Sequence, residues 1–319
     1  MTRRKVLVTG GAGFIGSHVA EAHVRRGDRV WIADNLSSGK RANVPAGAEL
    51  IVMDIADAAL DDLLRGIDGV DLISHHAAQI DVRVSVTQPR RDAATNIDGF
   101  LNVVECGRRH GVRRVLYVSS GGVVYGEPER RPTPEGMPKL PRSPYGVSKL
   151  SGEHYLYYYA NEHGLEYAAL RYSNVYGPRQ DPHGEAGVVA IFSQRLLAGE
   201  PLTIFGDGAQ TRDYVYVADV VAANLLLADA PLEPPRTLDA RAYNVGTGVE
   251  TSVVELAAAL IEVSGRSVER RHAAARAGEL QHSCLDAARL RGLGWRPSVT
   301  LHEGLSHTFN YIASQEGAA

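Results

Sequence analysis

The sequence predicts an α/β protein with a doubly wound parallel sheet and a smaller C-terminal α/β lobe. Short β-branched runs alternate with longer helix-like segments along the first 175 residues, a glycine follows two of those segments, and the pattern turns irregular and Gly- and Pro-rich after about residue 174. Such alternation is typical of βαβ units and of a parallel sheet. We expect residues 1–174 to form the first domain, with residues 215–240 returning to it, and residues 175–214 and 241–319 to form the lobe.

The expected elements can be placed in order along the chain. Strands are predicted at residues 5–9, 29–33, 49–53, 71–74, 114–119, 167–171 and 202–205. Helices are predicted at residues 14–26, 89–110, 144–162 and 188–198. Gly27 and Gly111 directly follow the first two helices, and the end of a helix favours a residue that readily adopts a left-handed conformation.

Composition limits the class of protein. The chain has 319 residues, 44% of them hydrophobic, and 34 basic against 37 acidic side chains give a formal net charge of −3. This balance argues against a disordered chain and against a nucleic-acid partner. Cys106 and Cys284 form no CxxC pair, and the twelve histidines show no metal-ligand spacing, so we expect no metal and a reducing, cytoplasmic location. No apolar run approaches the roughly 18 residues of a spanning helix, so no membrane association is expected.

A glycine-rich turn follows the first expected strand and contains Gly10, Gly13 and Gly16. Glycine permits the tight turn, the close approach of a pyrophosphate and the packing of helix on strand, while the helix N-terminus offers N–H groups to the phosphates. Asp34 stands eighteen residues after Gly16, where an acidic residue hydrogen-bonds the ribose 2′-hydroxyl. These features predict a Rossmann domain that prefers NAD to NADP, because the Asp34 carboxylate would repel a 2′-phosphate even with basic residues nearby.

Tyr145 and Lys149 lie four residues apart at the start of an expected helix and therefore share one face. A tyrosine, whose pKa is ordinarily about 10, is a poor base at neutral pH, but a neighbouring ammonium and a cationic nicotinamide favour its phenolate. On its own such a pair is more often part of a helix surface. The preceding strand ends in Ser119 and Ser120, whose hydroxyls would lie at the carboxyl edge of the sheet, and this context favours a catalytic interpretation.

Several sequence blocks occur along nearly the whole chain: residues 9–16, 34–39, Ala77-Ala78, Asn96, Tyr125-Gly126, and residues 143–149, 170–174 and 212–214. Together they resemble the extended short-chain dehydrogenase/reductase family, and within it the nucleotide-sugar epimerases typified by UDP-glucose 4-epimerase. The resemblance implies an NAD-binding Rossmann domain and a C-terminal lobe that binds a nucleoside-diphosphate sugar, most simply a UDP-sugar.

The resemblance also implies roles for individual residues. Tyr145 would be the catalytic base, and Lys149 would bond the nicotinamide ribose. The implied cofactor contacts are Gly10, Gly13, Phe14, Ile15, Gly16, Asp34, Asn35, Ser38, Gly39, Asp54, Ile55, Ala77, Ala78, Asn96, Tyr145, Lys149 and Tyr172. The implied substrate contacts are Arg83, Asn174, Val188, Arg212, Tyr214, Arg276, Glu279 and Ser283. The guanidinium groups of Arg212 and Arg276 suit a phosphate clamp because their planar fork meets phosphate oxygens.

The chain departs from the family pattern at Gly121, where many members carry Ser or Thr four residues before the Tyr of Tyr-Gly. Ser120, Ser119 or a water molecule would then supply the hydroxyl that hydrogen-bonds the reacting group. The related dehydratases carry an Asp-Glu pair in this stretch and the decarboxylases a Glu. Because Gly121 and Gly122 provide no acid, the resemblance favours an epimerase.

The implied reaction inverts C4 of a UDP-sugar, with glucose and galactose as the basic pair. Tyr145 removes the C4 hydroxyl proton while C4 passes hydride to NAD, the 4-ketose turns, and hydride and proton return to the other face. Ser283 is small at the position that walls the sugar pocket, which extends the prediction to the N-acetyl forms. Arg83 could instead pair with a C6 carboxylate, which makes a UDP-glucuronate 4-epimerase one alternative. A net NAD(P)H-dependent 4-keto-sugar reductase is another.

A run of tyrosines follows the expected reactive helix start, at Tyr155 and residues 157–159. Without interleaved basic residues such a run is more often core or interface than a platform for nucleic acid. Members of the family that the chain resembles commonly dimerise through a helix bundle that includes this helix. We therefore expect a homodimer.

Overall fold

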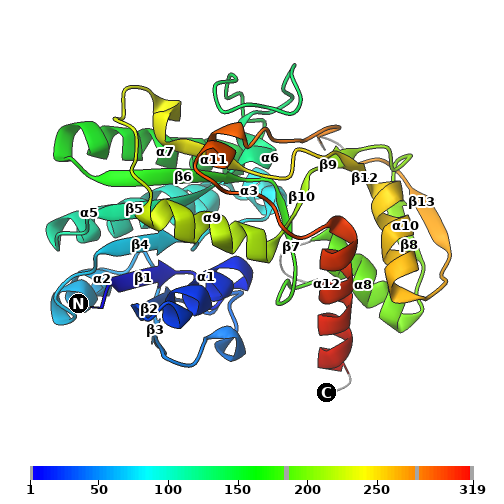
Figure 1. Cartoon of the computed structure of the whole chain (residues 1–319), viewed down its shortest axis with the longest axis horizontal. Coiled ribbons are helices and arrows are strands. Elements are labelled where there is room, and N and C mark those ends of the chain that lie inside the picture. The colour runs from blue at the N-terminus through cyan, green and yellow to red at the C-terminus, as the bar shows by residue number, and fades with distance from the viewer. Residues whose placement is uncertain (1–2, 183–186, 277–279, 317–319) are drawn as a thin grey trace. The chain divides into compact units, whose positions relative to one another are not determined.

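The computed structural model describes residues 3–182, 187–276 and 280–316. They belong to two compact units (Figure 1). Unit 1 takes Met1–Tyr125, Lys139–Arg171 and Val221–Tyr243, and unit 2 takes Gly126–Pro138, Tyr172–Val220 and Asn244–Ala319. The units differ from the expected lobes chiefly at Gly126–Pro138, because the backbone of Thr133 bonds with Cys284 and Asp286 of unit 2.

A seven-stranded sheet forms the centre of unit 1, in the order β11-β6-β5-β4-β1-β2-β3. The pairs β1/β2, β1/β4, β2/β3 and β4/β5 are parallel. The strands are β1 Lys5–Thr9, β2 Arg29–Asp34, β3 Ala48–Val52, β4 Leu72–His75, β5 Arg114–Ser120, β6 Glu166–Tyr172 and β11 Ala242–Val245. The chain runs outward from β1 to β3 and then returns to β4, so the adjacent ends of β1 and β4 form the topological switch point of the predicted doubly wound sheet.

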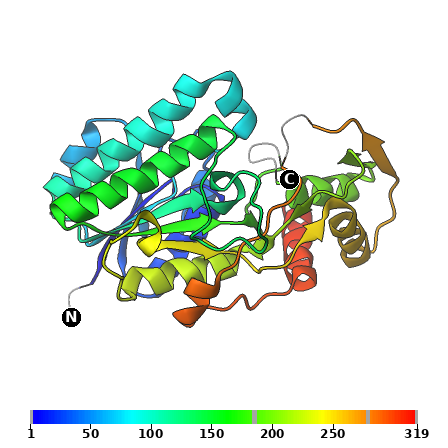
Figure 2. The same cartoon turned by 90° about the horizontal axis from the view of Figure 1, so that it is seen from above.

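Helices cover both faces of this sheet, which explains why its inner strands are apolar on both sides. Figure 2 shows α5 (Phe100–Arg109) and α7 (Pro144–His163) side by side on one face, and α9 (Val217–Asp229) on the other. The first helix, α1 (Phe14–Arg25), contacts β1, β2 and β3. Apolar side chains of strands and helices meet in one buried cluster that includes Leu7, Trp31, Ile73, Phe100, Val115 and Leu156.

Helix α7 has clear start and stop signals. Ser143 is its N-cap and accepts a hydrogen bond from the N–H of Gly146, and Pro144 occupies the first helical position, where its missing N–H costs nothing. Gly164 ends the helix with φ +68°, a left-handed conformation that glycine adopts without strain. Gly27 and Gly111 also have positive φ, as predicted.

The predicted continuous helix over residues 89–110 was wrong in its middle. The structure has α4 (Pro89–Ala93), a π-helical segment η2 (Ala94–Gly99) and then α5. Asn96 lies in η2, and its side chain bonds both the N–H and the carbonyl of Gln79 in the segment after β4. These bonds explain why the helix widens at η2. Such π segments often occur at functional sites. The remaining short elements of unit 1 are η1 Arg41–Asn43, α2 Ala59–Gly66, α3 Val82–Thr87, α6 Gly121–Val124 and η3 Leu238–Arg241.

Unit 2 combines three packed helices with short sheets. Helix α12 (Leu301–Glu316) packs on α8 (Val188–Ala198) and α10 (Val253–Ser264). The strand pairs are β10 (Tyr214–Tyr216) with β7 (Asn174–Tyr176), β12 (Thr251–Ser252) with β9 (Thr211–Arg212), and β13 (Arg270–Ala273) with β8 (Leu202–Phe205). A short helix, α11 (Ala288–Gly292), completes the unit. Among the described residues, none of the helices is long and apolar enough to cross a membrane.

Candidate functional site

The glycine turn lies at the switch point between β1 and β4. Gly10 has φ +66°, and a Cβ there would lie 2.6 Å from the backbone nitrogen of Ala77. A Cβ on Gly16 would lie 2.3 Å from the Gly10 carbonyl oxygen. A Cβ on Gly13 would meet only that same oxygen, at 3.2 Å, and Gly13 caps α1 without a side chain. The N-terminus of α1 is thus approached by backbone that carries no side chain at Gly10, Gly13 or Gly16, an arrangement that fits a dinucleotide pyrophosphate.

Asp34 ends β2 beside this turn and is almost fully buried. Its Oδ2 accepts the Ala12 N–H at 2.9 Å and its Oδ1 accepts the Leu36 N–H at 2.8 Å. Gly39 packs so closely that a Cβ there would lie 2.7 Å from Oδ1. The carboxylate is thus fixed against the glycine turn, and each oxygen keeps a lone pair for a ribose hydroxyl. Residues and geometry fit NAD at this end of the sheet.

The other predicted cofactor residues surround the same edge or its approaches. Asn35 donates a hydrogen bond to Asp54 at 2.8 Å. Asn96 uses its whole amide inside the protein, on Gln79 and Asp92, so it shapes the segment after β4. Among the rest, Phe14, Ile55 and Tyr172 are buried, Ile15, Ala77 and Ala78 are half-buried, and Ser38 is exposed.

Replacing Gly16 by alanine is expected to weaken NAD binding by roughly tenfold or more. The added methyl would collide with the Gly10 carbonyl, and the turn that faces the pyrophosphate would have to move. Calorimetric titration of NAD into cofactor-free protein measures the effect. Gly66→Ala is the matched control, because a Cβ at Gly66 meets nothing within 4 Å. An unchanged Kd in Gly16→Ala would contradict the placement of the cofactor.

Tyr145 and Lys149 are one turn apart near the start of α7, as predicted. The Lys149 Nζ lies 5.8 Å from the centroid of the Tyr145 ring and donates a hydrogen bond to the Val118 carbonyl at 2.9 Å. Lys149 is only 2% exposed. This burial lowers the pKa of Lys149 to about 8, and the nearby Asp92 acts in the opposite direction.

The two serines at the end of β5 have different surroundings. Ser119 is buried and donates a 2.5 Å hydrogen bond to Glu153, which in turn binds Arg171. Ser120 is half-buried, and within the described part of the chain its hydroxyl has no hydrogen-bond partner. The chain then passes through Gly121 into α6. Of the two predicted hydroxyls, the one on Ser120 is available to a ligand.

Unit 2 brings several predicted substrate residues together. In the β7/β10 pair Asn174 lies opposite Tyr214, and the N–H of buried Ser283 bonds the Thr211 carbonyl next to Arg212. The buried Asp213, for which no role was predicted, organises this region by accepting bonds from Thr247, Gly248 and Leu285. Burial raises the pKa of the Asp213 carboxyl, although these hydrogen bonds oppose the shift.

The remaining predicted substrate residues are more scattered. Val188 is the first residue of α8, and Arg276 is exposed with its guanidinium 3.8 Å from the centroid of the Phe205 ring. Glu279 lies outside the described residues. Arg83, in unit 1, forms an exposed ion pair with Asp81 at 2.7 Å. The positive charge that would meet a C6 carboxylate is therefore already paired.

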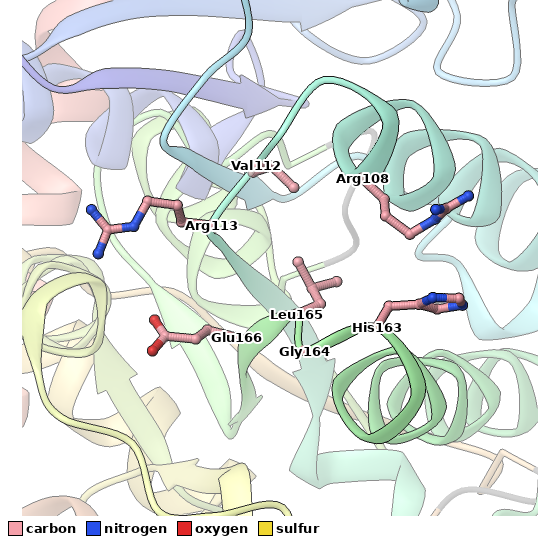
Figure 3. A pocket seen from close by; sticks show the side chains of 7 residues that line it. All are labelled: Arg108, Val112, Arg113, His163, Gly164, Leu165 and Glu166. Atoms are coloured by element: carbon pink, nitrogen blue, oxygen red, sulfur yellow. The ribbon is translucent and has the colours of Figure 1, made fainter.

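A cavity of about 390 Å³ lies at the opposite edge of the sheet (Figure 3). It is formed where β5 and β6 begin and where α5 and α7 end, by Arg108, Val112, Arg113, His163, Gly164, Leu165 and Glu166. By contrast, the glycine turn follows the carboxyl end of β1, and Ser120 is the last residue of β5. The cavity is therefore separate from the dinucleotide site.

Fold and site define a Rossmann-type protein that has a glycine turn at the switch point of its sheet and a tyrosine-lysine pair at the start of α7. The NAD dependent epimerase/dehydratase family matches residues 6–246. The chain belongs to this family.

Known proteins of similar sequence or structure match this chain over nearly its full length. The chain is 45% identical over 317 residues to the UDP-glucose 4-epimerase of Mycolicibacterium smegmatis, covering 98% of this chain and 99% of that protein. It resembles the crystal structure of the Thermotoga maritima UDP-glucose 4-epimerase with UDP-glucose, with TM-score 0.93, 44% identity and coverage of 98% and 99% of the two chains. The Thermus thermophilus UDP-glucose 4-epimerase complex with NAD gives TM-score 0.90, 44% identity and coverage of 97% and 98%.

These findings confirm the predicted fold class, the predicted resemblance to nucleotide-sugar epimerases and the prediction of an NAD-dependent enzyme. The roles given to individual side chains stay predictions.

Proposed function

We propose that this chain is an NAD-dependent UDP-sugar 4-epimerase that interconverts UDP-glucose and UDP-galactose. The observation that carries the proposal is the buried Lys149 beside Tyr145, on the same unit as a glycine cradle and a ribose-binding carboxylate. The similarity to UDP-glucose 4-epimerases over nearly the full chain supports the same conclusion.

The chain's own residues move and hold the proton. Bound NAD would supply the reversible hydride acceptor for C4. Tyr145, as phenolate, takes the C4 hydroxyl proton and later returns it, and the Lys149 ammonium stabilises the phenolate by charge. The Ser120 hydroxyl would hydrogen-bond the reacting oxygen. Because Gly121 and Gly122 offer no carboxyl group, this stretch provides no acid for elimination or decarboxylation.

In unit 2, Asn174 would contact the diphosphate region and Arg212 and Arg276 would clamp the phosphates. Tyr214 would line the nucleotide site. Ser283 leaves room beside the sugar, so we extend the proposal to UDP-GlcNAc and UDP-GalNAc. The pairing of Arg83 with Asp81 gives UDP-glucuronate no comparable support. No conversion of UDP-GlcNAc by pure enzyme would restrict the substrates to glucose and galactose.

The deciding experiment incubates purified protein with UDP-galactose, UDP-GlcNAc and UDP-glucuronate in separate tubes, without added reductant. NMR of the products identifies a C4 epimer and its sugar. We expect UDP-glucose from UDP-galactose. A fourth tube holds a UDP-4-keto sugar with added NADH, and stoichiometric consumption of NADH there, with no C4 epimer in the other tubes, would instead identify a net reductase. No product in any of the first three tubes would contradict the proposed substrate class.

We also propose that the enzyme is a homodimer formed through α7. Val147, Tyr155 and Tyr158 expose apolar surface at helical spacing, with Tyr158 49% exposed. Around Ser151, His154, Tyr155 and Tyr158 the surface is hollowed by about 490 Å³. The neighbouring α3 adds the exposed Val86. Contiguous apolar surface of this kind marks a protein interface more often than it faces water.

Replacing Tyr158 by glutamate is expected to convert the dimer to a monomer, because an unpaired carboxylate would be buried in the apolar interface. Sedimentation velocity measures the change in mass. Val249→Glu is the matched control. Like Tyr158, Val249 is an exposed large hydrophobic residue, 61% exposed, but it belongs to unit 2. A wild-type protein that sediments as a monomer would refute this proposal.

A reducing, cytoplasmic location completes the proposal. Cys106 and Cys284 are both buried and form no disulfide. Burial raises the pKa of the Cys106 thiol, and raises that of Cys284 to about 12. Both thiols therefore stay protonated and unreactive at neutral pH.

A further inference from the structure

Asp92 is a buried acidic residue that the proposed mechanism does not use. It lies on α4 and is 0% exposed. Its Oδ1 accepts bonds from Gln79 Nε2 and Asn96 Nδ2, both at 3.0 Å, and its Oδ2 accepts the Ser148 hydroxyl at 2.6 Å. Ser148 directly precedes Lys149 on α7. A buried acid in contact with the reactive helix calls for an explanation.

The bonds around Asp92 fix it as an acceptor. Asn96 Oδ1 accepts the N–H of Gln79 at 2.9 Å, so the amide nitrogen of Asn96 must face Asp92. Gln79 Oε1 accepts the N–H of Asp81 at 2.6 Å, so its amide nitrogen also faces Asp92. Amide N–H groups can only donate. The two amides donate to Oδ1 and the Ser148 hydroxyl donates to Oδ2, so each of these bonds is one that a carboxylate accepts.

The side chains that surround Lys149 show why the negative charge of Asp92 matters. On its own helix Lys149 faces Tyr145, and from β5 the Tyr117 ring lies 5.2 Å from Nζ. His75, the last residue of β4, and His76, which follows it, also face Lys149. Burial lowers the pKa of both, that of His76 to about 3, so both stay neutral. Burial keeps Tyr117 neutral by raising its pKa.

Asp92, on α4, is the acid whose charge acts on the Lys149 ammonium; Glu153, one turn further along α7, is instead bound to Ser119 and Arg171. Removing the charge of Asp92 would leave a buried ammonium with a neutral carbonyl as its hydrogen-bond partner.

We propose that Asp92 is a positioning residue for proton transfer: through Ser148 it fixes the start of α7, and its charge keeps Lys149 an ammonium at neutral pH. This inference rests on the proposed function, because the ammonium matters only if Tyr145 must act as a phenolate. Because Asp92 is fully buried, it would touch neither substrate nor cofactor.

The test reads the charge of Lys149 directly. The chain has only four lysines, Lys5, Lys40, Lys139 and Lys149, so isotope-labelled lysine gives a simple NMR spectrum, and Lys149→Met assigns the signal. Asp92→Asn keeps the size of the side chain, and the rotatable Ser148 hydroxyl can accept a bond from the new amide. We expect the Lys149 titration midpoint to fall by roughly one pH unit or more in Asp92→Asn. The other three midpoints should not move.

Activity gives a second, independent reading. In Asp92→Asn the alkaline limb of the kcat profile should move to lower pH with the Lys149 midpoint. Ser148→Ala removes the hydrogen bond but keeps the charge, so it should lower kcat at every pH without moving either the limb or the midpoint. Tyr158→Phe is a control that should change neither.

An unchanged Lys149 midpoint in Asp92→Asn overturns the proposal, and so does a wild-type Lys149 that is already neutral at pH 7. The second result does not depend on Asp92→Asn, so it can overturn the proposal even if that variant fails to fold. The lysine titration uses neither sugar nor cofactor. A protein without epimerase activity would therefore refute the proposed function, whereas the titration tests the influence of Asp92 on Lys149 by itself.

Discussion

Replacing Tyr145 by phenylalanine is expected to lower kcat for C4 inversion by about 10²–10⁴-fold. The substitution removes one oxygen and leaves α7 intact, because the start of that helix depends on Ser143 and Pro144 and its attachment on Ser148. Without the phenol no group on α7 can take the C4 proton, since Lys149 is bound to the Val118 carbonyl. NAD affinity should change little. Product NMR under saturating UDP-galactose measures the rate.

Tyr155→Phe is the matched control for this substitution. It removes a phenol oxygen from the same helix, ten residues further on, where the side chain is partly exposed. Its kcat should equal the wild-type value. If Tyr145→Phe retained more than about a tenth of the wild-type rate, another group would have to be the base.

Replacing Glu153 by glutamine is expected to lower the free energy of unfolding by about 3–5 kcal/mol. Glu153 and Arg171 form a bidentate pair whose side chains are 1% and 0% exposed. Although burial opposes it, the Glu153 charge holds the pKa of Arg171 above its ordinary value. Removing that charge deprives a fully buried guanidinium of an anionic partner, although its ion pair with Asp239 remains. Denaturant unfolding monitored by circular dichroism measures the loss.

Two further variants separate the buried pair from a general charge effect. Asp62→Asn breaks an exposed pair with Arg65 and should cost less than about 1 kcal/mol. The double variant Glu153→Gln/Arg171→Met removes both charges of the pair and should recover much of the loss, because Asp239 keeps its ion pair with Lys139. Equal losses of unfolding free energy for Glu153→Gln and Asp62→Asn would show that the buried pair contributes no more to stability than the exposed pair.

Local sequence patterns were sufficient to predict the elements that depend on residues close together in the chain. The alternation of strand and helix predicted β1 and α8 with the bounds that the structure has, and the glycine turn and Asp34 meet as expected. These features depend on backbone conformation and on periodic burial, which a short stretch of sequence records directly.

The features that were missed depend on partners far away along the chain. Asp92 bonds Ser148 fifty-six residues later, and Asp213 bonds Leu285 seventy-two residues later. In a helical pattern a buried acid resembles any acid on a solvated face, so its sequence position alone gives no sign of burial. Likewise the helical pattern over residues 89–110 did not predict the π-helical segment η2, in which Asn96 bonds Gln79, seventeen residues earlier.

Helix α7 has consequences for how the sequence can change over time. Along it, Tyr145 and Lys149 serve the reaction, Ser148 meets Asp92, Glu153 meets Arg171, and Tyr158 faces outward. An insertion of one residue would rotate everything beyond it by about 100°. Every contact of α7 beyond the inserted residue would then be lost. We therefore expect α7 to change by substitution, and insertions and deletions to fall in the loops around it.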